Sequence, residues 1–317
     1  MTDPPPIPLV LRTRLAHATL QAVADDCGAD ILHIKGGAVH ASLRPARPDA
    51  PAGASLEELA LTRISADADI LVRPAHLRRF LAALKHYGWE GRTRLYSGGA
   101  VEHSVDWWHP ELGGADIHVR FPGIQIPADR AFEELWSERR SQDIAHRPCL
   151  VPSLDAQRLV LLLHAARNGG ARSPDAAQSW TAASAFEQDR VRALATTLRA
   201  EVALAAATGH LEEYADRPEY DLWRLLALPD ADVFDLWVAM VKAAPTSFDR
   251  ARVVVYALRV KADRVGLRLQ RRATLAEVVD AHGNRLLRGA AGVGGLVGRV
   301  TSRLIARLRG GASGRSS

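Results

Sequence analysis

The chain has 317 residues, 47% hydrophobic and 24% charged, which is typical of globular proteins and excludes disordered and fibrous classes. Its net charge of +5 is modest for this length, so it permits an anionic ligand without requiring nucleic acid. Two cysteines give no disulfide framework, and no leader or run of about 18 apolar residues stands out, so we expect a cytoplasmic protein without a transmembrane segment.

The N-terminal part is predicted to contain a helix, a strand and a glycine turn. Apolar residues at helical spacing predict a helix over residues 11–27, and residues 31–34 have the composition of a short strand. Lys35-Gly36-Gly37 follows that strand directly. A glycine pair between a strand and a following helix would let backbone N–H groups approach a phosphate closely. An ordinary tight turn is the alternative explanation.

The segment from Arg63 to Val72 carries the strongest functional pattern. A strand here would point Asp67 and Asp69 to the same face, because side chains alternate along a strand. Two neighbouring carboxylates repel each other, and a divalent cation with oxygen ligands relieves that repulsion. Ion pairs with arginines or exposure to water would also relieve it, since Asp-x-Asp is a short pattern. Arg63 has two open roles, contact with a triphosphate or an ion pair with one of these acids.

The middle of the chain is predicted to alternate helices and strands. On the last of these strands Asp116, His118 and Arg120 share one face, which is either solvated or the lining of a site. Trp107 and Trp108 cannot both face inward from a strand, and core packing is the commoner role for the one that does. The expected elements are a loop at 44–55, helices at 56–61 and 75–87, and strands at 89–96, 101–108 and 115–121.

From residue 129 onward the pattern is mostly helical, with a link containing Pro148 and Pro152 after the first helix. We expect three parts: a domain over 1–150, a helical domain over 151–287 and a basic Gly/Ala/Arg-rich tail over 288–317. The tail has the spacing of a basic amphipathic helix, which suits a membrane surface or an anionic partner, but a loosely ordered terminus is the commoner explanation. The predicted helices lie at 129–139, 155–167, 187–208, 219–228, 230–243 and 248–264.

The order of these features favours a two-metal phosphoryl-transfer site. A strand with a Gly-Gly turn, a strand with Asp-x-Asp and a later strand with Asp116 would bring three carboxylates together. One metal would bind a triphosphate, and the other would lower the pKa of the attacking hydroxyl. Asp116 would ligate the second metal or accept the proton. The protein then contributes positioning and charge neutralisation.

Four stretches of the chain have the form of sequence motifs. They are Lys35-Gly36-Gly37-Ala38, Arg63-x-x-x-Asp67-x-Asp69-Ile-Leu-Val72, Asp116-Ile-His118 and Leu161-Leu-Leu-His-Ala-Ala-Arg167. They resemble the motifs of the uncharacterised nucleotidyltransferase family, within the polymerase-β-like superfamily. The resemblance covers roughly residues 25–210. It implies an α+β fold, a small mixed sheet flanked by helices and followed by a mostly helical domain. It also implies dependence on Mg²⁺ (or Mn²⁺) and transfer of a nucleoside monophosphate from an NTP.

Motif by motif, the resemblance implies that the acids bind metal and take part in catalysis. It implies that the glycine turn, with Lys35 and Arg63, binds the nucleotide. Gly37 stands where the superfamily usually has serine, so a hydroxyl contact to phosphate is missing. Asn168 stands where a second helical histidine is expected, and His164 alone is more often structural. The expected residues are Asp67, Asp69 and Asp116 for metal and catalysis, Lys35, Gly36, Gly37 and Arg63 for the nucleotide, and His118, Arg120 and His164 on the substrate side.

Three functions remain open at this stage. The first is an enzyme that moves the nucleoside monophosphate to a small metabolite, a peptide or a sugar, as in biosynthesis. The second is a non-catalytic protein of the same fold that binds a nucleotide or a partner, which the glycine in place of serine favours. The third is a toxin- or antitoxin-like enzyme acting on RNA or protein. Basic residues over 259–272 would then bind nucleic acid, although a solvated helix face is the commoner explanation.

Overall fold

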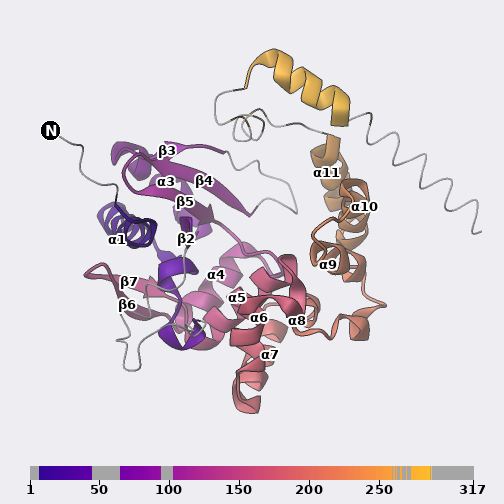
Figure 1. The fold of residues 1–317 in the computed structure, drawn as a ribbon, viewed down its shortest axis with the longest axis horizontal. Helices are drawn as coiled ribbons and strands as arrows, with labels where there is room; N and C mark the ends of the chain where they lie inside the picture. Colours follow the sequence, from indigo (N-terminus) through magenta and orange to yellow (C-terminus); the bar gives the residue numbers. More distant parts are fainter. Residues whose placement is uncertain are drawn as a thin grey trace, which may run out of the picture. The chain divides into compact units, whose positions relative to one another are not determined.

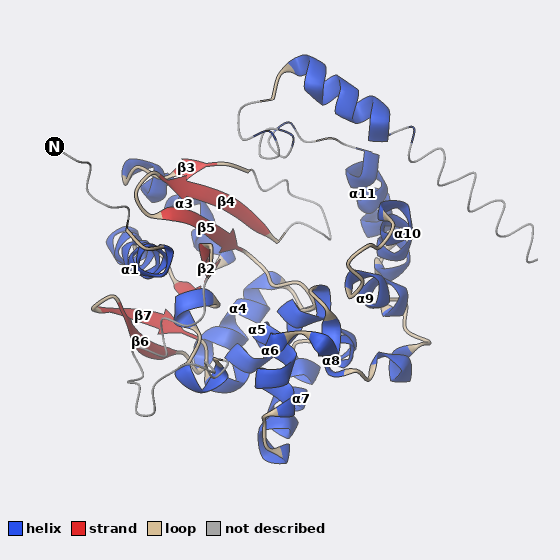
Figure 2. Cartoon of the chain, viewed as in Figure 1, coloured by secondary structure: helices blue, strands red, loops and turns tan. Residues whose placement is uncertain are grey.

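The computed structural model of the chain describes residues 7–44, 65–93 and 103–258, with parts of 260–287. Within them the protein mixes α-helices and β-strands, as the sequence predicted (Figure 2). The chain divides into two compact units, Met1–Asp230 and Ala231–Ser317. The three-part division expected from the sequence stays a prediction. Five expected features lie outside the described residues: nearly all of the loop at 44–55, the helix at 56–61, Arg63, the basic residues of 259–272 and the tail at 288–317.

A five-stranded mixed sheet organises the N-terminal half of the first unit (Figure 1). Its strand order is β1-β2-β5-β4-β3. The central strands β2 and β5 run parallel, and the other neighbouring strands run antiparallel. The predicted strand after Arg63 thus begins at Asp67. The strands are β1 (Ile31–His33), β2 (Asp67–Val72), β3 (Glu90–Gly91), β4 (Ser104–His109) and β5 (Gly113–His118).

Helices α1 (Leu9–Cys27) and α3 (Leu77–His86) bury one face of this sheet (Figure 1). Ile70 of β2 packs there with Leu20 of α1 and Phe80 of α3, and all three side chains are fully buried. Burial of each such side chain contributes roughly 1.5–3 kcal/mol. Because side chains alternate along a strand, the two aspartates of β2 point to the opposite face.

A second core surrounds α5 (Leu154–Arg167), whose buried side chains occur on every side of the helix. Leu163 of α5 shares one apolar cluster with Leu71 of β2 and with Ala203 of α8 (Glu201–Thr208). The cluster joins residues on both sides of position 150, so the sheet and the helices of this unit share a core. The other helices of the unit are α4 (Ala128–Ser137), α6 (Pro174–Ala176), α7 (Ala185–Thr197) and α9 (Tyr220–Leu226).

A hairpin replaces the link expected after α4. Strands β6 (Arg140–Ile144) and β7 (Arg147–Val151) pair antiparallel around Ala145 and His146. Both turn residues have positive φ, 53° and 59°. Tight hairpins usually place asparagine and glycine in that conformation, so the sequence carried no turn signal. Pro148 within β7 is also uncommon in strands.

Two predicted helices are wrong in detail. The helix expected directly after the glycine turn is a pair of 3₁₀ turns, Gly36–Ala38 and Ala41–Leu43, separated by extended backbone. The Nε of Arg44 donates to the carbonyl of Val39 at 2.8 Å, which holds the chain in that bent path. The helix expected at 187–208 is divided into α7 and α8, because Arg199 takes a positive φ of 51° between them.

The second unit contains α10 (Val233–Ala243) and α11 (Ser247–Leu258), which pack against each other. The Asp232 side chain caps α10 by accepting hydrogen bonds from the N–H groups of Phe234 and Asp235. Across the described part of the chain, no helix has both the length and the apolar character needed to cross a membrane.

Candidate active site

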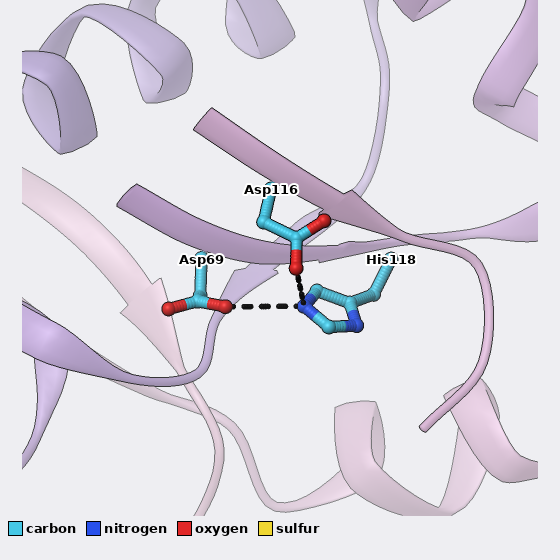
Figure 3. A group of neighbouring side chains, drawn as sticks. All are labelled: Asp69, Asp116 and His118. Atoms are coloured by element: carbon cyan, nitrogen blue, oxygen red, sulfur yellow. Dashed lines mark hydrogen bonds and ion pairs between the residues drawn. The ribbon is translucent and has the colours of Figure 1, made fainter. Parts of the chain in front are cut away.

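Asp69 and Asp116 are direct neighbours across the parallel strands β2 and β5 (Figure 3). Leu71 pairs with His118 one step further along, so His118 projects from the same face as the two acids. Ligand atoms of Asp69, Asp116 and His118 all lie within 4.8 Å of one another. Since adjacent strands are spaced about 4.8 Å apart, the strand ladder itself sets the separation of the two carboxylates.

His118 links the two acids. Its Nε2 lies 3.1 Å from Asp69 Oδ1 and 3.1 Å from Asp116 Oδ2, so one N–H is shared between two carboxylates (Figure 3). The His118 side chain is 2% exposed. Burial alone would lower the pKa of His118, but the charge of Asp116 and the hydrogen bonds to both acids raise it above its ordinary value. The imidazole therefore contributes positive charge between the carboxylates.

Lys35 reaches the same acid from the end of β1. Its Nζ lies 2.5 Å from Asp69 Oδ1, the oxygen that also accepts from His118. Burial acts to raise the pKa of Asp69, but the hydrogen bond from His118 and the Lys35 ammonium hold it below its usual value. Burial likewise acts to raise the pKa of Asp116, and the charge and hydrogen bond of His118 outweigh it, leaving that pKa well below the ordinary range.

Asp67 lies on the same face of β2 but outside the group of three. Burial, together with repulsion from Asp69 and Asp116, raises the pKa of Asp67. The Lys35 ammonium and the hydrogen bond from Ser65 Oγ, at 3.4 Å from Asp67 Oδ1, act to lower that pKa but offset the rise only in part. Gly114 leaves room beside it, because a Cβ there would lie 3.3 Å from Asp67 Cβ. Asp67 is thus the least compensated of the three acids and gains most from added positive charge.

The glycine turn packs tightly against the start of β2. Gly36 has a φ of +59°, and a Cβ at this position would lie 3.0 Å from Ser65 Cβ. The carbonyl of Gly37 accepts hydrogen bonds from Arg44 Nη2 at 3.2 Å and from Gln142 Nε2 at 3.3 Å. The turn is therefore held by side chains from two directions beside the acids.

Two of the residues expected on the substrate side, His164 and Arg120, are not part of the group formed by Asp69, Asp116 and His118. His164 Nδ1 lies 3.1 Å from Asp175 Oδ2 of α6, and its carbonyl accepts from the Asn168 side chain. Arg120 follows the end of β5 and is half-buried. Any part that these two residues play at the site stays a prediction. His118, the third of that set, lies between the acids instead.

Arg167 is the last residue of α5 and of the Leu161–Arg167 motif, and no role was predicted for it from the sequence. Its Nη1 lies 3.3 Å from His103 Nε2, and the His103 ring is tilted against the ring of His118, with the two ring centroids 5.3 Å apart. Burial lowers the pKa of Arg167, and the nearby charge of Asp116 acts in the opposite direction. An arginine at the end of an otherwise apolar, buried helix was the available signal.

The donor set fits a divalent cation. Asp69 and Asp116 offer carboxylate oxygens, the ligands that Mg²⁺ and Mn²⁺ prefer, and His118 would become a third ligand only after losing the Nε2 proton that it shares with them. Asp67 beside them, the least compensated of the three acids, favours the same conclusion. The site therefore has the chemistry to bind a cation and, through it, an anionic ligand such as a triphosphate.

Comparison with known proteins gives one match. A family model described as an uncharacterised nucleotidyltransferase matches residues 56–216, just over half of the chain and within the first compact unit. The match includes β2, β5 and α5, the elements that carry Asp69, Asp116 and Arg167. No curated protein and no solved structure matches the chain.

Proposed function

Because this chain belongs to the uncharacterised nucleotidyltransferase family, we propose that it transfers a nucleoside monophosphate from an NTP to an acceptor in a reaction that depends on a divalent metal. One observation carries the proposal beyond the family: Asp69 and Asp116 meet across a parallel strand pair with their ligand atoms close together. Buried acids at this spacing are suited to holding a cation against a triphosphate.

The reaction balances without an additional reactant. A nucleophilic oxygen or nitrogen of the acceptor forms a bond to the α-phosphorus, while the bond from that phosphorus to the bridging oxygen breaks. Pyrophosphate leaves with the electron pair, and the proton of the nucleophile passes to a base. When bound, a divalent cation supplies charge neutralisation and lowers the pKa of the attacking group. Asp69 and Asp116 would hold it, because their ligand atoms lie close together, and the lowered pKa of Asp116 agrees with a ligand role.

The other residues of the site would orient the donor. Lys35 already reaches Asp69 from the end of β1, and Gly36 and Gly37 come next in the chain. A cation bound by the acids would release the Lys35 ammonium, whose flexible stem can turn towards a phosphate. The N–H groups of the glycine turn would contact the same triphosphate. Mg²⁺ or Mn²⁺ and an NTP are therefore the proposed ligands.

Calorimetric binding of ATP, GTP, CTP and UTP with Mg²⁺ tests this function. We expect the wild type to bind at least one of them only when metal is present. Asp69→Asn and Asp116→Asn should weaken that binding about tenfold or more, since each removes a cation ligand. Asp189→Asn, at an exposed position on α7, is the matched control and should have no effect. Binding that is the same without metal, or unchanged in both site variants, would contradict the proposal.

One observation favours a second candidate, a protein that binds nucleotides without turnover. Lys35 and His118 already compensate the charge of Asp69, so this acid does not require a cation. This candidate predicts metal-dependent NTP binding with no pyrophosphate released in the presence of any acceptor. Release of pyrophosphate by the wild type, lost in Asp69→Asn, would exclude it.

A further inference from the structure

Arg167 is a half-buried cation with no ion-pair partner in the part of the chain that the structure describes. Among the described residues, its guanidinium has one polar contact, His103 Nε2 at 3.3 Å, and no carboxylate lies within ion-pair distance. A guanidinium has five N–H donors, so most of its capacity is unused there. Burying a cation without a carboxylate in direct contact is costly, so such a group is suited to binding an anion from outside the chain.

A buried arginine with a structural role on the same helix is paired with an acid. Arg158, nine positions earlier on α5, is also buried, and its guanidinium forms an ion pair with Glu187. Arg73, at the end of β2, is paired with Asp30 at 2.7 Å. Arg167 differs from both because its neighbour is an imidazole. His103 accepts from the guanidinium and so orients it without neutralising it.

The acids separate Arg167 from Lys35. In the strand order β1-β2-β5-β4, Lys35 and the glycine turn follow β1, on one side of the two central strands. His103 directly precedes β4 on the other side, where its carbonyl accepts from the N–H of Val119 at 2.9 Å. Arg167, in contact with His103, thus lies on the β4 side of the acids, and Lys35 lies on the β1 side.

Nucleotidyl transfer needs two such sides. The attacking and leaving groups lie roughly in line on opposite sides of the phosphorus. If the donor triphosphate binds at Lys35 and the glycine turn, the leaving pyrophosphate lies on the β1 side. The acceptor then approaches from the β4 side, where it meets Arg167.

We propose that Arg167, oriented by His103, binds an anionic group carried by the acceptor, either a carboxylate or a phosphate. This inference rests on the proposed function and narrows it, because neutral acceptors lack the group that this guanidinium would recognise. A guanidinium matches the planar carboxylate and the phosphate with paired hydrogen bonds. Arg167 is a substrate-binding residue in this scheme, and His103 is a positioning residue.

The test compares two matched variants of the full chain. Arg167→Met alters the proposed acceptor side, and Lys35→Met alters the proposed donor side. The first measurement is binding of a non-hydrolysable NTP with Mg²⁺. The second, on the nucleotide-loaded protein, is binding of two probes, orthophosphate and acetate, followed by NMR. The two probes distinguish a phosphate-bearing from a carboxylate-bearing acceptor.

We expect opposite effects in the two variants. Arg167→Met should keep the NTP affinity within about twofold and weaken binding of the preferred probe anion about tenfold or more. Lys35→Met should weaken the NTP about tenfold or more and leave the probe anion unchanged. If Arg167→Met instead weakens the NTP as much as Lys35→Met does, the guanidinium serves the donor, and the inference is overturned while the proposed function stands. It is also overturned if the loaded wild type binds neither probe. A wild type that binds no NTP overturns both proposals.

Thermal unfolding shows whether Arg167→Met folds. Should it fail, Arg167→Lys and His103→Gln carry the test, because the first keeps the charge and the second keeps a hydrogen-bond acceptor. Both should weaken the probe anion several-fold with NTP affinity unchanged, since the lysine loses the paired geometry and the glutamine orients the guanidinium less firmly. Unchanged anion binding in both would overturn the inference.

Discussion

Asp69 Oδ1 accepts from two cationic side chains at once, Lys35 and His118, and this sharing determines what a cation must displace. Asp69 is 3% exposed, so its charge depends on these partners rather than on water. A divalent cation would take the place of the Lys35 ammonium. The residue-scale consequence is that Lys35 stabilises the protein most when metal is absent.

Lys35→Met should therefore lower the free energy of unfolding by about 1–3 kcal/mol without metal, because a buried carboxylate loses a partner. With excess Mn²⁺ the loss should shrink, since a cation bound to the folded state replaces the missing charge. Urea unfolding in EDTA and in Mn²⁺ measures both values. Lys85→Met, at an exposed position on α3, is the control. An equal loss in both conditions would show that Lys35 and the cation do not compete.

A second buried polar group lies between α1 and β1. His17 and His33 are fully buried, and their Nδ1 atoms are 2.8 Å apart. His33 Nε2 donates to Gln21 Oε1, which also accepts from the N–H of Leu150. This leaves His33 Nδ1 as the acceptor and His17 Nδ1 as the donor. Both imidazoles are therefore neutral in the folded protein.

Stability should fall as the pH falls through this pair's window. Burial lowers the pKa of His17 from 6.5 to about 4 and lowers that of His33 well below 6.5. Between those values the unfolded chain binds protons that the folded chain does not, so stability is fully present above pH 6.5 and is lost towards pH 4. For His17 alone the loss amounts to roughly 3 kcal/mol. Urea unfolding near pH 7 and near pH 5 checks this.

The control for the pH effect is the pair of variants His17→Gln and His86→Gln. The first removes a group whose pKa is about 4 in the folded chain and 6.5 in the unfolded chain, so its stability should depend less on pH between those values. The second alters an exposed histidine on α3 and should follow the wild type. A wild-type stability that does not change over this range would refute the argument.

At the scale of elements, the glycine turn and the helix end before β1 offer a matched comparison. Gly36 and Gly28 both have positive φ, +59° and +65°. Alanine at either position has a backbone cost of about 1–2 kcal/mol. Only at Gly36 does the new Cβ also meet a neighbour, Ser65 Cβ at 3.0 Å, whereas nothing lies within 4 Å at Gly28.

Gly36→Ala should thus destabilise the protein more than Gly28→Ala does, and it alone should weaken NTP binding. Denaturant unfolding and calorimetry on both variants give the comparison. Equal effects of the two substitutions on NTP binding would show that the shape of the glycine turn does not matter to the nucleotide.

Elements with strong local patterns could be predicted from the sequence. The apolar spacing around Phe80 predicted α3, and the alternation around Asp67 and Asp69 predicted β2 with its acids on one face. The β6–β7 hairpin could not be predicted, because Ala145 and His146 adopt a conformation that these residues rarely take. Tertiary contacts, rather than the local conformational propensity of the residues, maintain such turns.

The site was predictable only in part, for a similar reason. The spacing of Asp67 and Asp69 pointed to a cluster of acids, but the meeting of Asp69 with Asp116 depends on the register of β2 against β5. No local pattern encodes that register. The positions of His118 between the acids and of Arg167 behind His103 also follow from long-range packing. The roles of these residues stay predictions.

At the scale of the whole molecule, the first compact unit contains both large apolar cores and the entire family match. We expect a chain ended after Asp230 to fold by itself and to keep the metal-dependent NTP affinity within about twofold. Thermal unfolding and calorimetry, compared with the full chain, test this. A shortened chain that folds but does not bind would assign part of the nucleotide site to residues beyond Asp230.

The ladder between β2 and β5 has an evolutionary consequence. The backbone pairing sets the separation of Asp69 and Asp116. The apolar residues Ile70 and Ile117 of the same strands face the opposite side of the sheet, towards α1 and α3. We therefore expect substitutions at the acids to change the site and substitutions in that apolar layer to change the stability of the sheet. Under the proposed function, the chemistry of the site could then change during evolution while the same sheet is kept.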